Sequence, residues 1–413
     1  MAALLSVKDA RARIIEAAAP ADTEPLPIME AFGRTLAAPV AAAHDQPPFK
    51  ASAMDGYAVR FADASKAGAH LHLIGEARAG VPFMETLKAR ETARIFTGGV
   101  VPPGADHILI QEEAERTGDD TIRVTVDQNA PSHIRAAGID VKAGAAIAEP
   151  GDVLVGALPA LIAAAGVGEV MAARPPKVSL LTTGDEIVPA GTPLRAGQVS
   201  DATSASLAGL IARWGGAPVH RGHASDTEDS LRERLAAARE AGADILVPIG
   251  GASVGDYDLV KGVLGAEGME LLFAGVAVKP GKPLWLGRLG DMRVLGLPGN
   301  PASALACAHL FLKVLIRASL GARAEPEVET APARLAHAMQ NRGGRETYAR
   351  ALVYADENGQ LAARQTGSQD SSLLKPFADA NALLRLQPRT SYDVGDVADV
   401  MFLDAGLSAQ PSR

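Results

Sequence analysis

An apolar run that ends in glycines stands past the middle of the chain: Ile245-Leu246-Val247-Pro248-Ile249-Gly250-Gly251. A short apolar run bounded by turn-forming residues is typical of a strand buried on both faces of a sheet. The glycines predict a tight loop where that strand ends. The pattern favours an α/β protein built around a parallel sheet.

The sequence around this run alternates between strand-like and helix-like patterns. Further strands are predicted at 178–181, 271–278 and 293–297. Helical periodicity predicts helices at 205–214, 230–241 and 302–320. Such alternation predicts a central doubly wound, mostly parallel α/β domain.

The rest of the chain has a different character. Between Pro47 and Gly144, short β-type runs are separated by Gly, Pro and Asp, which predicts a β-rich module. A helical pattern that ends at Pro20 and another from Gly151 to Ala165 flank this module, so we expect it to be inserted into a helical linking domain whose two flanks pack together. Beyond an acidic segment with two prolines, short strands predict a small C-terminal β-barrel. The expected domains are a helical linking domain (1–45 and 145–174), an inserted β-rich domain (46–144), an α/β domain (175–325) and a C-terminal β-barrel domain (326–413).

The composition excludes several classes of protein. With 47% hydrophobic and 21% charged residues in 413, the chain is not intrinsically disordered. A net charge of -8 and an aromatic content of 4% argue against a nucleic-acid surface. The single cysteine, Cys307, fits a reducing compartment, and no export signal or membrane span is evident. We therefore expect a cytoplasmic protein with no nucleic-acid or membrane partner.

Three strand ends of the α/β region carry glycine-containing loops. They are Thr183-Gly184-Asp185-Glu186, Gly250 to Gly255, and Pro298-Gly299-Asn300-Pro301. Ligands of open parallel sheets bind at the carboxyl ends of the strands, where loop and helix N–H groups attract anions. The loops match neither the P-loop nor the GxGxxG pattern. Together they still predict a site for a phosphate-bearing ligand.

Charged residues of both signs accompany these loops. Lys279 and Lys282 follow an apolar strand in a stiff setting of Pro and Gly, which favours anion binding. Carboxylates on the same loops, with one from the β-rich module, are Asp185, Glu186, Asp226, Asp256, Asp258 and Asp140. Bare carboxylates repel an anion, so we expect a hard divalent cation, Mg²⁺, between them and the ligand. The alternative role of each Asp is to cap a helix.

A serine hydrolase is an alternative interpretation of one loop. Gly251-Ala252-Ser253-Val254-Gly255 matches the GxSxG nucleophile elbow. Downstream histidines are confined to His309, in an apolar helix, and His337, and no HGGG-type motif precedes the loop. These features disfavour a hydrolase, and Cys307 is predicted to be a core residue rather than a nucleophile.

Six motifs follow one another along the chain. They are Ser52 to Arg60 (SAMDGYAVR), Ala93 to Gly98 (ARIFTG), Thr183 to Glu186 (TGDE), Gly250 to Gly255 (GGASVG), Lys279 to Pro283 (KPGKP) and Leu297 to Pro301 (LPGNP). In this order, over about residues 5–405, the chain resembles the molybdopterin molybdenumtransferase family, which includes the E domain of gephyrin.

The resemblance implies a transferase of molybdenum cofactor biosynthesis. Such an enzyme takes adenylylated molybdopterin and molybdate, inserts molybdenum into the dithiolene and releases AMP, with Mg²⁺. It also implies an elongated homodimer whose site lies between the α/β domain of one subunit and the β-rich module of the other. Contacts with molybdopterin adenylyltransferase and with molybdoenzyme chaperones are expected.

The resemblance also assigns roles to individual residues. The expected catalytic residues are Asp55, Asp140, Glu186, Asp226, Asp258, Lys279 and Lys282, of which Glu186, Asp226 and Asp258 are expected metal ligands. The expected substrate-binding residues are Thr97, Arg135, Thr183, Gly184, Gly250, Gly251, Ser253, Gly255, Pro298, Asn300, Pro301, Arg350 and Ser371. Asp55, Thr97, Arg135 and Asp140 are expected to act from the partner subunit. The chain departs from the family pattern at Arg135-Ala136-Ala137 and Asp201-Ala202-Thr203, so contacts there are expected to differ.

Two further functions remain as alternatives. Residues 175–325 also resemble molybdopterin adenylyltransferase, although the additional domains argue against that activity. The relationship to gephyrin suggests a dimeric scaffold protein as the other alternative.

Overall fold

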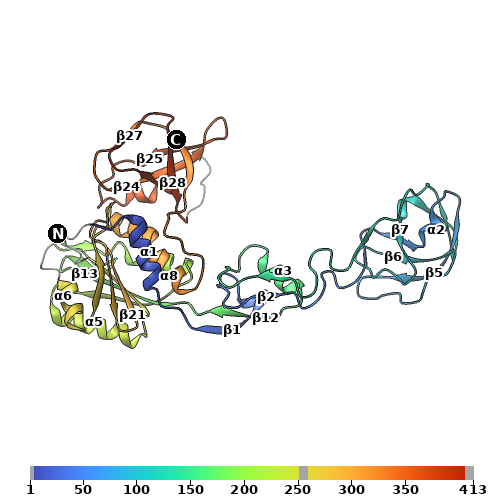
Figure 1. The fold of residues 1–413 in the computed structure, drawn as a ribbon, viewed down its shortest axis with the longest axis horizontal. Coiled ribbons are helices and arrows are strands. Elements are labelled where there is room, and N and C mark those ends of the chain that lie inside the picture. Colours follow the sequence, from blue (N-terminus) through green and yellow to red (C-terminus); the bar gives the residue numbers. More distant parts are fainter. Residues whose placement is uncertain (1–3, 251–258, 405–413) are drawn as a thin grey trace.

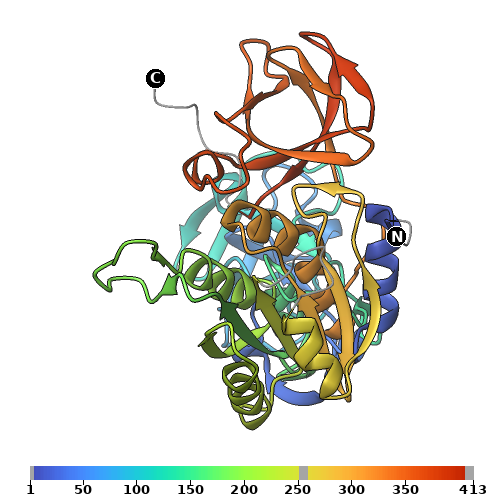
Figure 2. The same cartoon turned by 90° about the vertical axis from the view of Figure 1, so that its left-hand side faces the viewer.

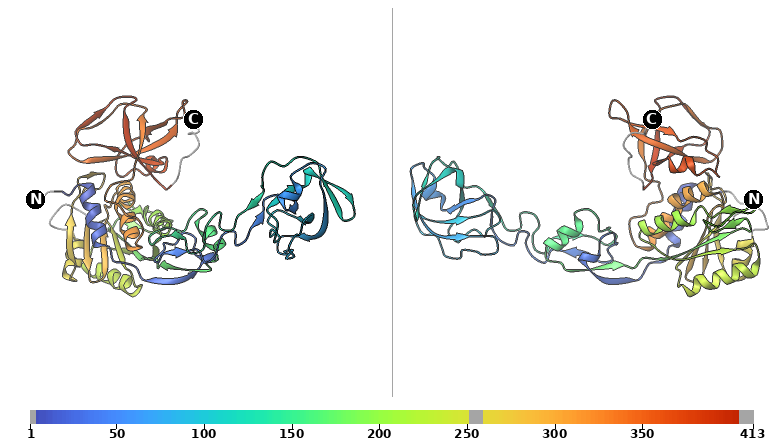
Figure 3. Two further views of the ribbon diagram at one scale, coloured as in Figure 1. Left: turned by 45° about the vertical axis from the view of Figure 1, so that its right-hand side comes forward. Right: turned by 180° about the vertical axis from the view of Figure 1, so that it is seen from behind.

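The molecule is elongated, with its largest body at one end (Figure 1). The computed structural model describes residues 4–250 and 259–404. The α/β domain and the C-terminal barrel lie together at one end, the β-rich module lies at the other, and a slender linking region joins them. Figure 3 shows the same separation from two further sides.

The α/β domain is built on a six-stranded sheet in the order β16-β13-β17-β21-β20-β18. The strands are β13 (Lys177–Thr183), β16 (Ala217–Ala224), β17 (Ile245–Ile249), β18 (Glu270–Ala274), β20 (Trp285–Leu289) and β21 (Met292–Gly296). The first four strands in this order run parallel, whereas β20 and β18 pair antiparallel. The predicted mostly parallel sheet is confirmed. The predicted strand at 271–278 is two elements, β18 and the separate β19 (Val278–Lys279).

Helices cover both faces of this sheet (Figure 2). They are α4 (Ser204–Arg213), α5 (Glu228–Glu240), α6 (Leu259–Ala266), α7 (Pro301–Cys307), the π-helical turn η3 (Ala308–Leu312) and α8 (Lys313–Ser319). Buried residues of α4, α7, η3 and α8 form one core with the sheet, and those of α5 and α6 form another. The short parallel pair β14 (Ile187–Val188) and β15 (Val199–Ser200) lies beyond β13. By length and composition Pro301–Ser319 could cross a membrane, but 83% of its apolar window is buried inside the protein.

The first helix of the chain, α1 (Val7–Ala17), belongs to the α/β core. Its N-cap Ser6 accepts a hydrogen bond from the Asp9 backbone N–H at 3.0 Å. Val7, Ala10 and Ile14 are buried in the core that α7, η3 and α8 share. We expected this helix to pack with the second flank of the module. The structure differs because the apolar stripe of α1 fits the α/β core instead.

The linking region is less helical than predicted. Its elements are β1 (Thr23–Pro27), η1 (Ile28–Glu30), β2 (Val40–Ala41), β11 (Ala146–Ala148), α3 (Leu158–Ala164) and β12 (Glu169–Ala173). The pairs β1–β12 and β2–β11 are antiparallel ribbons, and a small core joins both flanks of the inserted module. The helix predicted over 151–165 is confined to α3, since Pro159 is accommodated only in a first helical turn.

The inserted module is a curled sheet in the order β7-β4-β6-β5-β9-β8. Its strands are β4 (Gly56–Val59), β5 (His70–Ala77), β6 (Glu91–Ile95), β7 (His107–Ile110), β8 (Ala114–Gly118) and β9 (Thr121–Val124). The short elements β3 (Ala51–Ser52), α2 (Phe61–Ala64), η2 (Gln111–Glu113) and β10 (Ile134–Arg135) complete it. Each face of the sheet has its own small core. This confirms the β-rich character predicted for the region.

The C-terminal region contains a closed five-stranded barrel, as predicted. The strands β22 (Ala331–Leu335), β24 (Glu346–Ala355), β25 (Leu361–Gln365), β26 (Ala382–Leu386) and β28 (Val397–Phe402) form it, and the pairing of β24 with β26 closes the ring. The elements β23 (Met339–Asn341), α9 (Lys375–Ala378) and β27 (Thr390–Tyr392) lie between them. Strand β19 of the preceding region pairs in parallel with β24, so the barrel sheet extends into the α/β domain.

Arg11 ties α1 to the rest of the chain, and its removal should destabilise the α/β domain. Its buried guanidinium donates to the Leu310 carbonyl at 2.6 Å and to the carbonyls of Glu325, Pro326 and Glu327. Arg11→Met leaves these acceptors unpaired, so we expect a loss of about 2–4 kcal/mol in unfolding free energy. Differential scanning calorimetry should measure this loss of unfolding free energy. Arg13→Met is the matched control, because Arg13 makes one exposed contact of 3.4 Å to Leu272; an equal loss in both variants would contradict the assignment.

Candidate functional site

Three loops meet at the carboxyl edge of the parallel strands. Gly250 follows β17 with a φ of +99°, and a Cβ placed there would lie 2.8 Å from the Thr183 carbonyl oxygen. A Cβ on Gly299 would lie 3.2 Å from the Cα of Gly250. Only glycine allows this approach and this backbone conformation. The loops after β13, β17 and β21 are therefore packed against one another.

Polar groups face this junction from the ends of β13 and β16. The Thr183 hydroxyl is buried and has no hydrogen-bond partner in the described chain. The Glu186 carboxylate folds back over Gly184, in the space that a side chain at 184 would need. Asp185 Oδ1 accepts a hydrogen bond from the Asp226 backbone N–H at 3.0 Å, which joins the two loops. The predicted residues Thr183, Gly184, Glu186 and Asp226 thus lie at one edge.

Within residues 4–250 and 259–404, no three His, Cys, Asp or Glu side chains gather closely enough to hold a metal ion. Of the three expected metal ligands, Glu186 and Asp226 are on the edge just described. Asp258 lies outside the described residues, as do Gly251, Ser253 and Gly255. The GxSxG alternative rests on the same segment, 251–258.

Lys279 is carried by a short strand that the barrel holds, and Lys282 lies in the turn that follows. Val278 and Lys279 pair with Glu346 and Thr347 at the start of β24. Arg345 donates to the Val278 carbonyl at 3.2 Å, directly before Lys279. Neither the Lys279 ammonium nor that of Lys282 has an ion-pair partner in the described part of the chain. Two cations without a partner are well suited to bind an anion.

The loop after β21 is also held by the barrel. Asn300 Nδ2 donates to Ser371 Oγ at 2.6 Å, and the Ala302 backbone N–H donates to the Ser371 carbonyl at 3.1 Å. Pro301 opens α7, where proline is favoured. The predicted residues Pro298, Asn300, Pro301 and Ser371 are therefore brought together.

Arg350 has a structural task in this arrangement. It is buried, and its guanidinium donates to the Ser368 and Asp370 carbonyls at 3.1 and 3.0 Å. Burial lowers the pKa of this guanidinium from its ordinary value. Since Ser371 is the next residue, Arg350 fixes the barrel loop that contacts Asn300.

The predicted residues of the inserted module form a second group. Asp55 Oδ1 accepts hydrogen bonds from the backbone N–H and from the hydroxyl of Thr97, both at 2.8 Å. These bonds, together with the charge of Arg94, hold the pKa of Asp55 below its ordinary value. Arg135 lies on β10, and the Asp140 backbone N–H donates to the Gln46 carbonyl at 3.0 Å. Both Arg135 and Asp140 are exposed.

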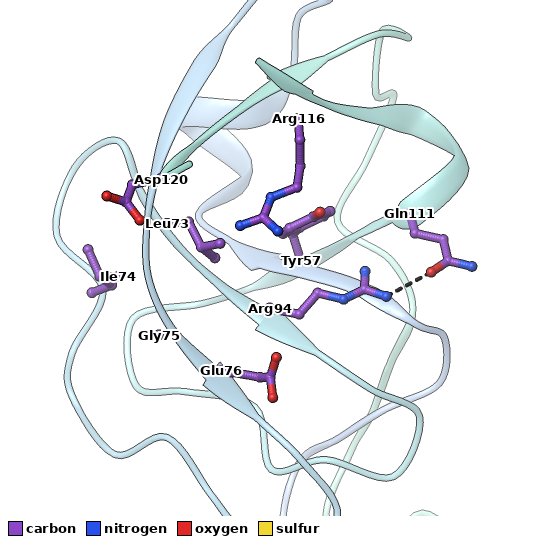
Figure 4. Close-up of a pocket in the computed structure, with 9 residues that line it drawn as sticks. All are labelled: Tyr57, Leu73, Ile74, Gly75, Glu76, Arg94, Gln111, Arg116 and Asp120. Carbon is purple, nitrogen blue, oxygen red and sulfur yellow. Dashed lines mark hydrogen bonds between the residues drawn. The ribbon is translucent and has the colours of Figure 1, made fainter. Parts of the chain in front are cut away.

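A polar pocket of about 570 Å³ lies on the sheet of this module (Figure 4). Arg94 occupies its centre, beside Tyr57 and Gln111. Sequence reasoning did not assign a role to Arg94. The available signal was its place in the ARIFTG motif, three residues before Thr97.

One chain does not bring the two groups of residues together. The α/β loops and the Asp55–Thr97 turn lie in the bodies at opposite ends of the molecule, with the linking region between them (Figures 1 and 3).

Cys307 is a core residue, as predicted. It is fully buried, and burial raises the pKa of its thiol, which disfavours a nucleophilic thiolate.

Comparisons with known proteins cover nearly the whole chain. Residues 5–166 match the MoeA N-terminal region (domain I and II), residues 179–318 a probable molybdopterin binding domain, and residues 332–403 the MoeA C-terminal region (domain IV). A molybdopterin molybdenumtransferase of Haemophilus influenzae is 33% identical over 96% of this chain and 98% of its own. That of Bacillus subtilis is 29% identical over 97% of this chain and 94% of its own. A molybdopterin biosynthesis MoeA protein from Pyrococcus horikoshii has a similar structure, with a TM-score of 0.79 and 27% sequence identity. The match covers 97% of this chain and 100% of the Pyrococcus chain.

The Thr97 hydroxyl should contribute to the lowered pKa of Asp55. A hydrogen bond to the ionised carboxylate favours that form, so its loss in Thr97→Val should raise the pKa of Asp55. The backbone N–H bond remains, so the rise should be partial. NMR titration of the carboxyl carbon measures it, and Thr97→Ser, which keeps the hydroxyl, is the control. Any stability that these bonds add is present above the unfolded-state pKa of about 3.9 and is lost as pH falls through the folded-state value. An unchanged pKa in Thr97→Val would contradict this role.

Proposed function

The chain belongs to the molybdopterin molybdenumtransferase family, enzymes of molybdenum cofactor biosynthesis, and on this premise we propose that it inserts molybdenum from molybdate into adenylylated molybdopterin and releases AMP. The observation that supports this most is the meeting of three strand-end loops at the edge of the sheet where β18 also ends, followed by two lysines that have no ion-pair partner in the described chain. The edge offers loop N–H groups, the buried Thr183 hydroxyl and cationic side chains. All of these suit an anionic ligand.

The charges of the substrates explain the need for these residues. Molybdate and the phosphates of adenylylated molybdopterin repel each other, so gathering them requires cations. Lys279, on the strand that the barrel holds, and Lys282, in the turn after it, supply positive charge. The Thr183 hydroxyl can donate to an oxygen of the ligand. Pro298 and Pro301 shape the loop after β21, in which Asn300 is oriented by Ser371.

Mg²⁺ fits the carboxylates present on this edge. This ion is usually held by one or two carboxylates together with substrate phosphates and water, rather than by an all-protein cage. Glu186 and Asp226, on adjoining loops, would provide those carboxylates, with Asp258 as the third expected ligand. When bound, the ion would make the adenylyl phosphate a better leaving group.

We further propose that the site is completed in a cytoplasmic homodimer. Asp55, Thr97, Arg135 and Asp140 lie far from the lysines of their own chain, so they would act on the site of the partner subunit. Met29 and Phe32 of the linking region are 88% and 68% exposed, which is unusual for apolar side chains and fits a subunit contact. Molybdopterin adenylyltransferase, as the source of the substrate, and molybdoenzyme chaperones, as acceptors of the product, would be its protein contacts.

AMP release tests the proposed reaction. The purified protein with adenylylated molybdopterin, molybdate and Mg²⁺ should release AMP and yield active cofactor. Lys279→Met should reduce the rate by about 10- to 1000-fold, because it removes a charge that gathers the anions. Lys375→Met is the control, since Lys375 pairs with Asp379 on the barrel surface. Absence of AMP release from the unmodified protein would refute the proposal. Normal dimers without activity would then favour the scaffold alternative. Consumption of ATP with unmodified molybdopterin would favour the adenylyltransferase alternative.

Mixed dimers test whether the site is shared. Asp55→Asn and Lys279→Met should each retain only a small residual activity alone, because each impairs both sites of its homodimer. Random pairing after co-expression makes about half of the dimers heterodimers, and one of the two sites in each heterodimer is intact. About a quarter of the wild-type activity should therefore return. No recovery, with heterodimers shown by differential tags, would place both residues in the same subunit's site.

A further inference from the structure

Arg94 is held in one orientation by the strands around it. It lies on β6 directly opposite Tyr57 of β4, and its guanidinium carbon is 5.1 Å from the centre of that ring. Phe96, two residues further along the chain, places its ring centre 4.8 Å from the same atom. Side chains two apart on extended backbone share a face, so the guanidinium sits between two aromatic rings. Figure 4 shows it crossing the sheet toward Gln111.

The guanidinium contacts both sides of the turn that carries Asp55. One terminal nitrogen donates to the carbonyl of Gly56, the residue after Asp55, at 3.1 Å. The other donates to Gln111 Oε1 at 2.7 Å, and the Gln111 backbone N–H donates to the Asp55 carbonyl at 3.1 Å. Arg94 thus fixes the backbone of Asp55 through two separate partners.

Arg94 does not form an ion pair with the carboxylate beside it in the sheet. Glu76 is its neighbour on β5, but the Glu76 carboxylate pairs with Arg78. Arg116, the other arginine of the pocket, donates to the Asp119 carbonyl at 2.8 Å, away from the Asp55 turn. The Arg94 guanidinium instead bonds on both sides of the Asp55 turn, and after the two Thr97 hydrogen bonds its charge is a further cause of the lowered pKa of Asp55.

We propose that Arg94 is a positioning residue of the transfer reaction, which clamps the Asp55 turn so that its carboxylate is presented to the site. This inference rests on the proposed function, because it takes Asp55 to act there. The planar fork of arginine makes both hydrogen bonds at once while it lies between the rings. Lysine would keep the charge and lose this geometry.

The test compares Arg94→Met, Arg94→Lys and the matched control Arg116→Met in the AMP-release assay. We expect both Arg94 variants to fall by about 10- to 100-fold, as for misplacement of a reacting group, and Arg116→Met to retain its rate. Thermal melting verifies that each variant is folded, and if Arg94→Met does not fold, Arg94→Lys alone decides. Wild-type rates in a folded Arg94 variant would overturn the inference.

Two readouts separate positioning from a merely structural role. If Arg94 acts through Asp55, the double variant Arg94→Met with Asp55→Asn should be no slower than Asp55→Asn alone. Losses that multiply would overturn the inference. The acidic limb of the rate profile should also move to higher pH in Arg94→Met, because the pKa of Asp55 rises without the nearby charge, and should stay in place in Arg94→Lys.

NMR titration of Asp55 separates failure of this inference from failure of the proposed function. It needs no turnover, so it reads the coupling even if the unmodified protein releases no AMP. In the same spectra, backbone amide signals of Asp55 and Gly56 that move in both Arg94→Met and Arg94→Lys support the clamp, and signals that stay at their wild-type positions overturn it; a higher Asp55 pKa in Arg94→Met reports only the loss of the nearby charge.

Discussion

The close packing of Gly250 against Thr183 is the constraint on which the α/β edge depends. A side chain at 250 would collide with the end of β13, so the loop after β17 can lie beside the loop after β13 only if it begins with glycine. Gly299 then packs on Gly250 and brings in the loop after β21. Backbone N–H groups, carboxylates and a buried hydroxyl are concentrated at this edge because the strands end together.

The barrel completes this edge from the other side. It takes up the strand that carries Lys279, and its loop at Ser371 holds Asn300. Arg350, buried beneath that loop, lends rigidity to the contact rather than a free charge. A C-terminal domain that is separate in sequence therefore fixes two of the loops that face the ligand.

The sequence was a good guide to elements with strong periodicity and to loops with distinctive residues. It predicted the parallel strands, the β-rich module and the barrel, because apolar runs and turn residues are local signals. It could not predict that α1 joins the α/β core, since an amphipathic stripe does not specify its partner. Nor could it show that β19 pairs with the barrel sheet instead of continuing β18. It also could not show that the Arg350 guanidinium is hydrogen-bonded to backbone carbonyls. Arg94 was missed because its role depends on two strands brought together by folding.

The N-terminal helix has a consequence for the order in which the chain acquires its structure. Arg11 bonds to groups 299 to 316 positions further along, so α1 has no place to dock until nearly the whole α/β domain has left the ribosome. The inserted module, whose sheet is complete between Gly56 and Val124, needs no such distant partner. Domains fold as units during synthesis, and distant contacts form late. The inserted module is thus expected to fold first, whereas the N-terminal residues of the chain are among the last to reach their folded position.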